Sequence, residues 1–175
     1  LKLLFGNVKA NSILLEINGK KVNSSKVINE KWIGYLPQHS FLPKNTKVRD
    51  LILMFHSDEK DQDCLVDEPH IATMTSKHVG ELSLGEVKYL EVVLLSYLPH
   101  PFLLLDEPFS MVDPLHKDLL KKHLQGLKGR KGIIITDHYY QDVLEISNQN
   151  MILVAGVCIE VTGENDLKKY KYLSR

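Results

Sequence analysis

The chain is poor in cysteine and has neither a long apolar run nor an excess of charge of one sign. Its two cysteines, Cys64 and Cys158, form no C-x-x-C pair and lie far apart, which favours a reducing, cytosolic setting. No apolar stretch approaches the roughly 18 to 20 residues of a membrane-spanning helix. Any role at a membrane is therefore expected to come through a partner.

The charge balance excludes another class of partner. Lys+Arg and Asp+Glu are each 22, so the chain has no overall basic field that would attract nucleic acid or an anionic membrane. We expect no nucleic-acid partner. The length of 175 residues, with 43% apolar and 25% charged residues, is typical of one ordinary globular domain.

The most informative stretch is the apolar run Phe102–Leu105, which ends in the adjacent carboxylates of Asp106 and Glu107. A run this apolar predicts a strand buried on both faces of a parallel sheet. Unpaired charges are costly to bury, so the two acids should lie where the strand leaves the core. Ligands of open parallel sheets bind there, and the pair could hold a metal or a reacting water. The alternative is a helix N-terminus, which also favours acids.

Alternating strand and helix patterns predict an α/β domain with a largely parallel sheet. The expected strands cover residues 13–17, 20–22, 32–36, 102–105, 133–136, 151–154 and 157–161, with a hairpin turn at Asn18-Gly19. The expected helices cover residues 1–5, 48–55, 86–98, 114–127 and 140–146. Ser83 and Glu86 form a capping box. The charged segment 58–63 is expected to be a loop, and His116 and His123 are expected to be solvated on a helix without binding metal.

Several short motifs resemble those of one family when they are taken in chain order. They are Tyr35–Gln38, Leu82–Glu86, Leu103–Glu107, Ser110–Asp113 and His138. They resemble the Q-loop, the LSGGQ or LSGGE signature, Walker B, the D-loop and the switch histidine of ABC (ATP-binding cassette) ATPases. The resemblance extends from Leu1 to about Gly163. It implies a P-loop NTPase-like ABC ATPase domain with a mainly parallel sheet core and a small helical subdomain at about residues 39–98.

One family motif, the phosphate-binding loop G-x-x-x-x-G-K-[ST], does not occur in the chain. Gly19-Lys20 lacks the leading glycine, and Gly80 to Glu86 has Glu86 in place of the lysine. In the family, the loop immediately precedes a helix and a phrase like Leu3–Gly6, and this chain begins with Leu1 rather than Met. We therefore expect residues 1–175 to be an N-terminally truncated, partial ABC ATP-binding domain. The alternative is a natural protein that has lost the loop.

Hydrolysis of ATP requires a held Mg²⁺, a positioned water and neutralised phosphate charge. The resemblance implies ATP and Mg²⁺ as cofactors. Asp106 would bind Mg²⁺ through water, and Glu107 would act as general base. His138, as a neutral imidazole, would donate to the γ-phosphate, and Gln38 would sense metal or water. The alternatives are a helix-start ion pair for the two acids, a surface histidine and a loop amide.

Ser83 and Gly85 lie at an expected helix start, where backbone N–H groups attract anions. The resemblance implies that they contact the γ-phosphate of ATP bound to the other subunit, and that Asp113, also a good N-cap, lies at the dimer interface. The alternative for Ser83 and Gly85 is a plain helix cap. Leu84 replaces a family glycine and adds bulk. Leu84 either weakens the contact across the dimer, which we favour, or packs in the helical subdomain.

The resemblance implies an ATP-binding and ATP-hydrolysing subunit of an ABC transporter, which couples hydrolysis to substrate transport across a membrane. Two such domains, as a homodimer or an unlike pair, would close on ATP. They would bind a transmembrane permease subunit at the cytoplasmic, inner face of the cell membrane. The phrases Asp106–Phe109 and Thr136–His138 look most like importers of branched-chain amino acids or exporters of lipopolysaccharide. The alternative is a regulatory or structural cassette protein that does not turn over ATP, which Leu84 and the missing loop favour.

Overall fold

The structure is a computed structural model that describes residues 1–173. These residues form two compact units, one from Leu1 to His138 and one that begins at Tyr139. Within residues 1–173, no helix is long and apolar enough to cross a membrane. The first unit contains every residue that the sequence predicts for the functional site.

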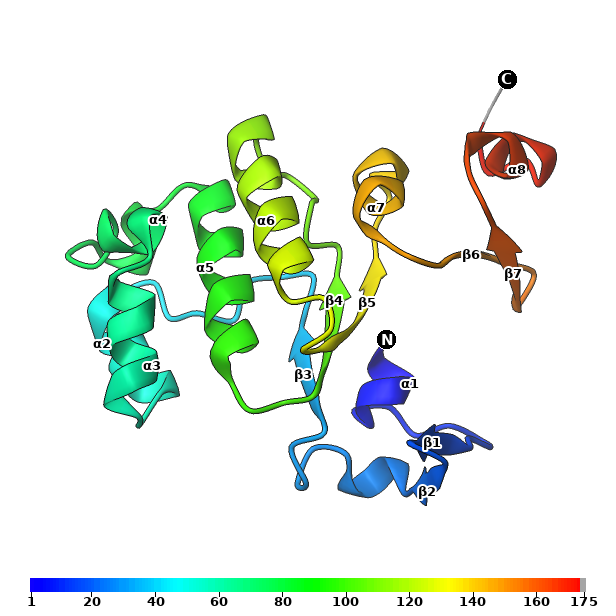
Figure 1. Ribbon diagram of the computed structural model, residues 1–175, viewed down its shortest axis with the longest axis horizontal. Helices are drawn as coiled ribbons and strands as arrows, with labels where there is room; N and C mark the ends of the chain where they lie inside the picture. Colours follow the sequence, from blue (N-terminus) through cyan, green and yellow to red (C-terminus); the bar gives the residue numbers. More distant parts are fainter. Residues whose placement is uncertain (174–175) are drawn as a thin grey trace. The chain divides into compact units, whose positions relative to one another are not determined.

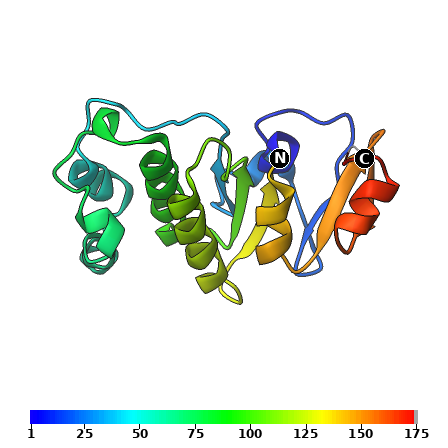
Figure 2. The same ribbon diagram turned by 90° about the horizontal axis from the view of Figure 1, so that it is seen from above.

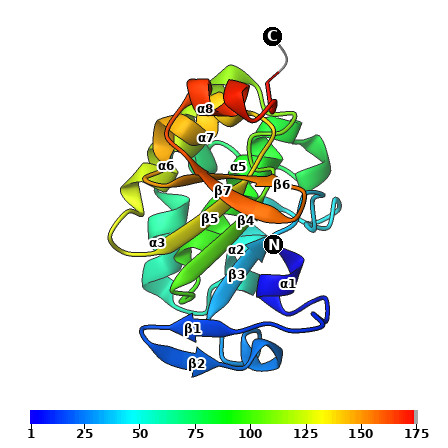
Figure 3. The same cartoon turned by 90° about the vertical axis from the view of Figure 1, so that its right-hand side faces the viewer.

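A parallel sheet lies at the centre of the first unit. Its strands are β3 (Ile33–Leu36), β4 (Phe102–Asp106) and β5 (Gly132–Thr136), in the order β3-β4-β5 (Figure 3). Leu103 and Leu105 in the central strand are fully buried, which confirms the expected buried strand. The register pairs Asp106 with Thr136. Polar residues at the carboxyl ends of neighbouring strands therefore meet at one edge of the sheet.

Two long helices, α5 (Leu84–Tyr97) and α6 (Pro114–Gly126), pack against each other, and α5 also packs against β3. The capping box of Ser83 and Glu86 is confirmed, and it sets the start of α5 at Leu84, two residues earlier than expected. Most of α5 is buried because it lies between the sheet and the preceding helices (Figures 1 and 2).

The segment between β3 and α5 is helical. It contains α2 (Val48–Phe55), α3 (Glu59–Val66), α4 (Pro69–Ala72) and the 3₁₀ helix η2 (Val79–Glu81). The expected loop at residues 58–63 is wrong, because Asp58 caps α3 by accepting from the Lys60 amide at 2.8 Å and α3 buries Leu65. The subdomain boundaries at about residues 39 and 98 stay a prediction.

The N-terminal part of the first unit follows the expected pattern. Helix α1 (Lys2–Phe5) ends at Gly6, which has a φ of 83°. Strands β1 (Leu15–Ile17) and β2 (Lys20–Val22) pair antiparallel through the expected Asn18-Gly19 turn, and the 3₁₀ helix η1 (Ser24–Lys26) follows. The Phe5 ring stacks on Tyr35 with centroids 4.9 Å apart, which ties α1 to the central sheet.

The second unit contains α7 (Tyr140–Ile146), the antiparallel pair β6 (Asn150–Val154) and β7 (Val157–Val161), and α8 (Glu164–Lys169). Its small core consists of Ile152, Val161 and Leu167. Helix α8 was not expected from the sequence. Asp166 stabilises the chain at its start by accepting from the Thr162 amide and hydroxyl, each at 2.8 Å.

Candidate functional site

Asp106 is the last residue of β4, and it receives a hydrogen bond from each neighbouring strand. Its Oδ2 accepts from the Tyr35 hydroxyl at 2.9 Å, and its Oδ1 accepts from the Thr136 hydroxyl at 2.8 Å. Burial, assisted by the Asp106 charge, raises the pKa of Tyr35 to about 12, so Tyr35 remains a donor at neutral pH. Tyr35 and Thr136 lie in motifs that the sequence indicated, but their bonds to Asp106 could not be predicted, because only the strand register reveals that they meet it.

Glu107 has a different set of partners, although it is adjacent in sequence. Its φ of 53° is in the left-handed region, and its amide donates to the Thr136 carbonyl at 2.7 Å. Its Oε2 accepts from Gln38 Nε2 at 2.9 Å, and its Oε1 lies 3.2 Å from His138 Nε2. The structure therefore brings together four predicted site residues, Gln38, Asp106, Glu107 and His138, which we call the sheet-edge cluster.

His138 and Glu107 differ in their exposure to solvent. The His138 side chain is 82% exposed, whereas that of Glu107 is only 17% exposed. Asp137, directly before His138, accepts from the Phe109 amide at 2.8 Å, and Phe109 is fully buried. The Asp137 side chain therefore attaches the turn after β4 to the segment after β5. The His138 ring, which follows directly in the sequence, remains exposed to solvent.

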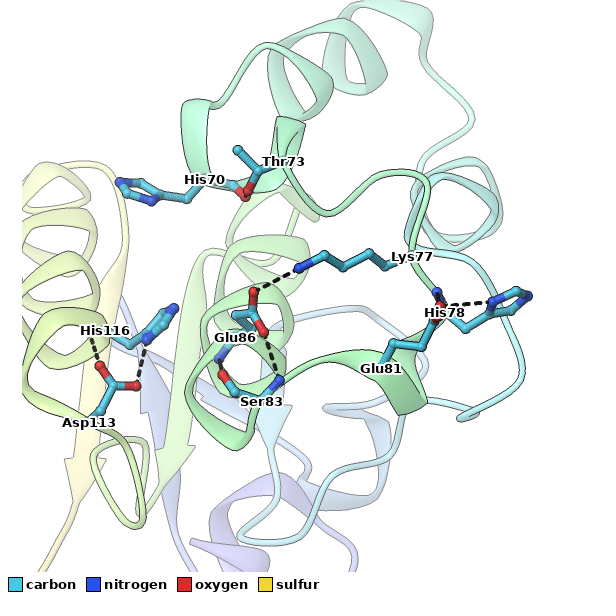
Figure 4. A network of polar contacts seen from close by, with 9 residues as sticks. All are labelled: His70, Thr73, Lys77, His78, Glu81, Ser83, Glu86, Asp113 and His116. Carbon is cyan, nitrogen blue, oxygen red and sulfur yellow. Dashed lines mark hydrogen bonds and ion pairs between the residues drawn. The ribbon is translucent and has the colours of Figure 1, made fainter.

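The remaining predicted residues, Ser83, Gly85 and Asp113, form a second group, which we call the helix-start cluster. Figure 4 shows Ser83 with its partner Glu86 and Asp113 with its partner His116. Ser83 Oγ accepts from the Glu86 amide at 3.1 Å, and Glu86 Oε2 accepts from the Ser83 amide at 2.7 Å. Asp113 likewise caps α6, since its Oδ1 accepts from the His116 amide at 3.2 Å and its Oδ2 lies 2.6 Å from His116 Nδ1. These contacts lower the pKa of Asp113.

Gly85 is the point where the starts of α5 and α6 touch. A Cβ at this position would lie 2.5 Å from Asp113 Oδ2 and 2.9 Å from His116 Nδ1. Both distances are shorter than real Cβ contacts. The close approach of the two helix starts therefore leaves no room for a Cβ at Gly85 unless the Asp113 and His116 side chains move, a reason for glycine that the sequence motif alone does not reveal.

The expectation that His116 and His123 are solvated is wrong. The His116 side chain is only 17% exposed and bonds Asp113. His123 Nε2 lies 2.8 Å from Ser96 Oγ, its ring packs edge-on against Tyr89, and burial lowers its pKa. His123 also lines a cavity of about 380 Å³ between α4, α5 and α6, whose lining includes none of the predicted site residues.

Leu84 is 62% exposed at the first position of α5. The alternative in which Leu84 packs in the helical subdomain is therefore wrong, because a side chain this exposed contributes little to a core. The favoured alternative, a weakened contact across a dimer, stays a prediction. The extra bulk of Leu84 lies on the surface beside Ser83 and Gly85.

The oxygen atoms of the sheet-edge cluster suit a hard cation such as Mg²⁺. Asp106, Glu107 and Gln38 all offer carboxylate or amide oxygens. Within the described residues, no group of three His, Cys, Asp or Glu side chains could hold a metal ion. The carboxylate of Asp106 fits Mg²⁺, which usually binds one or two carboxylates and completes its shell with water and substrate phosphates.

Comparison with known proteins identifies the family. The sequence profile of the ABC transporter family matches residues 1–110, which is more than half of the chain. The chain therefore belongs to the ABC transporter family, as its motifs predicted.

The chain aligns with only part of the length of three curated relatives. The Haemophilus influenzae lipopolysaccharide export system ATP-binding protein LptB is 28% identical over 169 residues, covering 90% of this chain and 70% of LptB. The Escherichia coli K12 protein of the same name is 31% identical over 134 residues. The alignment covers 71% of this chain and 56% of that protein. An uncharacterized ABC transporter ATP-binding protein from Rhizobium meliloti is 28% identical over 176 residues. The alignment covers 94% of this chain and 65% of that protein.

Solved structures confirm the fold. The ATP-binding subunit of an ABC transporter superimposes with a TM-score of 0.78 at 18% identity, covering 97% of this chain and 75% of that one. A nucleotide-free ATP-binding cassette from an ABC transporter gives a TM-score of 0.80 at 17% identity. The superposition covers 98% of this chain and 78% of that one. The expected α/β, P-loop NTPase-like fold is confirmed.

Proposed function

We propose that this chain is part of the ATP-binding and ATP-hydrolysing subunit of an ABC transporter. The observation that supports this function best is the sheet-edge cluster, in which Glu107 lies between Gln38 and His138 while Asp106 has its own partners. A protein that only binds nucleotide has no need of an acid placed between an amide and an imidazole. Membership of the ABC transporter family supports the same conclusion.

Each residue has a distinct part in this proposal. Asp106, oriented by Tyr35 and Thr136, would hold Mg²⁺ through water, and bound Mg²⁺ would neutralise phosphate charge. Glu107 would accept a proton from the attacking water. Gln38 would orient that water or the metal shell, and the exposed imidazole of His138 would donate to the γ-phosphate.

The helix-start cluster would act on ATP held by a second ABC domain, either a copy of this chain or an unlike one. The Ser83 side chain and backbone amides at the start of α5 would bind the γ-phosphate across the interface, with Asp113 beside them. The pair would bind a transmembrane permease at the cytoplasmic face of the membrane. The permease would select the substrate, and relatives named for lipopolysaccharide export favour the exporter class over amino-acid import.

The proposal requires a phosphate-binding loop upstream of Leu1 in the full-length protein. Residues 1–175 contain no such loop, so this polypeptide alone should show no measurable ATP turnover and weak or no nucleotide binding. The full-length protein should hydrolyse ATP in the presence of Mg²⁺. Micromolar affinity of residues 1–175 alone for Mg-ATP, measured by calorimetry, would contradict the requirement for this loop.

A second candidate function is a regulatory or structural cassette that binds without turnover. Leu84 in place of the family glycine favours it, because its bulk lies beside the predicted contact with the γ-phosphate. A full-length protein that dimerises on ATP but does not release phosphate would support this second function. Phosphate release that requires Mg²⁺ would support the first.

A further inference from the structure

Helix α5 contains a buried ion pair outside the motifs that led to the proposed function. Lys88 and Glu91 lie one turn apart, and their side chains are only 9% and 0% exposed. Lys88 Nζ lies 3.6 Å from Glu91 Oε2. Both residues sit on a helix whose other buried positions are mainly apolar.

Both charged side chains hold the backbone of one short segment, residues 38–41, which we call the Gln38 segment. Lys88 Nζ donates to the Gln38 carbonyl at 3.1 Å, and Glu91 Oε1 accepts from the Phe41 amide at 3.0 Å. Each end of the Gln38 segment is therefore attached to α5. Glu91 Oε2 receives no hydrogen bond from any described residue, and it forms the ion pair with Lys88.

A buried ion pair is weak support for a stabilising role, because apolar residues of similar volume often replace such pairs at no loss of stability. Its directional bonds, however, fix the position of whatever they hold. Here they hold the backbone of Gln38, whose side chain donates to Glu107 at 2.9 Å. The position of the Gln38 amide relative to Glu107 therefore depends on α5.

We propose that Lys88 and Glu91 are positioning residues for ATP hydrolysis, which tie the Gln38 segment to α5. This inference rests on the proposed function. The same helix begins beside Ser83 and Gly85, so a helix of about 1.5 Å rise per residue joins the helix-start cluster to the Gln38 segment. A shift of α5 when ATP is bound across the dimer moves the Gln38 segment, and the Gln38 amide moves relative to Glu107.

The decisive variant of the full-length protein removes both charges together, because removing one would leave the other buried and unpaired. Lys88→Met with Glu91→Leu deletes both bonds to the Gln38 segment and keeps the apolar volume. Lys88→Met with Glu91→Gln retains an acceptor for the Phe41 amide. Lys131→Met is the matched control, because Lys131 Nζ also donates to backbone carbonyls, those of Leu98 and His100, far from Gln38.

Hydrogen–deuterium exchange tests the attachment without requiring activity. In Lys88→Met/Glu91→Leu, exchange of the Phe41 amide should rise about tenfold, as expected when a protecting hydrogen bond is lost, while the amides of α5 stay protected. Lys88→Met/Glu91→Gln should leave Phe41 exchange near that of the wild type. Unchanged Phe41 exchange in the Leu variant would overturn the inference.

Steady-state kinetics test the positioning role. The Leu double variant should lower kcat about tenfold and change the KM for Mg-ATP by less than about twofold, because the nucleotide-binding surface is unaltered. Lys131→Met should leave both parameters unchanged. The positioning role would be overturned if the Leu double variant exchanged the Phe41 amide faster but kept the kcat of the wild type. It would also be overturned if Lys131→Met lowered kcat as much as the Leu double variant does. A wild-type protein without turnover would instead contradict the proposed function, and the exchange result would still decide the attachment.

Discussion

The two clusters of predicted site residues are built in different ways. In the sheet-edge cluster, hydrogen bonds join residues far apart in sequence, such as Gln38 to Glu107. In the helix-start cluster, bonds are local, from Ser83 to Glu86 and from Asp113 to His116, and the two helix starts meet at Gly85. Strand register therefore fixes the first cluster, whereas caps and one close approach fix the second. We therefore expect the sheet-edge cluster to be sensitive to substitutions that change a functional group. We expect the helix-start cluster to be sensitive to substitutions that add side-chain volume.

The largest effect is expected for Glu107→Gln in the full-length protein. Loss of a positioned base should reduce turnover by a factor on the order of 10² or more, while ATP binding is kept and a closed dimer accumulates. Phosphate release and size-exclusion chromatography with ATP measure the two effects. Glu16→Gln, on an exposed residue of β1, is the control. Wild-type turnover in Glu107→Gln would show that the base is misassigned.

Gly85→Ala tests volume in the helix-start cluster. The added Cβ would collide with Asp113 and His116, so the free energy of unfolding should fall by about 1–3 kcal/mol, as for overpacked sites. Denaturant titration measures the loss. Gly126→Ala is the control, because no atom lies within 4 Å of its ideal Cβ. Equal stability of Gly85→Ala and the wild type would remove the contrast between the clusters.

Leu84→Gly should have a smaller effect. Because Leu84 is exposed, the free energy of unfolding should fall by no more than about 1 kcal/mol, the helix propensity difference of glycine. ATP-driven dimerisation of the full-length protein should tighten by about 1 kcal/mol, the scale of one hydrogen bond. Sedimentation with ATP and thermal unfolding measure the two effects. A loss of stability of about 2 kcal/mol or more, with unchanged dimerisation, would contradict this expectation.

The smallest expected effect is a pH dependence at Asp113. Its contacts with His116 lower its pKa below the ordinary 3.8 in the folded state, so the unfolded chain takes up the proton first as the pH falls. Its contribution to stability is therefore present above the ordinary pKa and is lost as the pH falls through the folded-state value. The Tm advantage of the wild type over Asp113→Asn should stay constant above the ordinary pKa of 3.8 and shrink as the pH falls below it. An advantage that does not change with pH would contradict this.

Elements with a local signal were predictable from the sequence. Helix α2 has the expected bounds because its apolar residues recur at helical spacing, and the caps at Ser83 and Asp113 are in place because capping acts within one turn. Helix α3 was missed because its charged sequence hides a single buried residue, Leu65, that packs it. The apolar run of β4 correctly predicted a buried strand that ends in acids.

Contacts between distant segments were not predictable in the same way. The sequence indicated Asp106 and Glu107, but their separate partners depend on register and on the turn after β4. The partial burial of His123 and the burial of the Lys88–Glu91 pair were missed, because charged residues on a helix normally face water. Only the tertiary packing shows which of them turn inward.

The left-handed backbone of Glu107 has a consequence for any attempt to stabilise this protein. A non-glycine residue at a φ of 53° carries strain of about 1–2 kcal/mol, and glycine or asparagine would relieve part of it. Selection or engineering for thermal stability alone would therefore favour replacement of the residue with the proposed catalytic role. A library screened for folding and one screened for phosphate release should diverge at this position, and a stabilised variant that retains Glu107 must obtain its stability elsewhere in the chain.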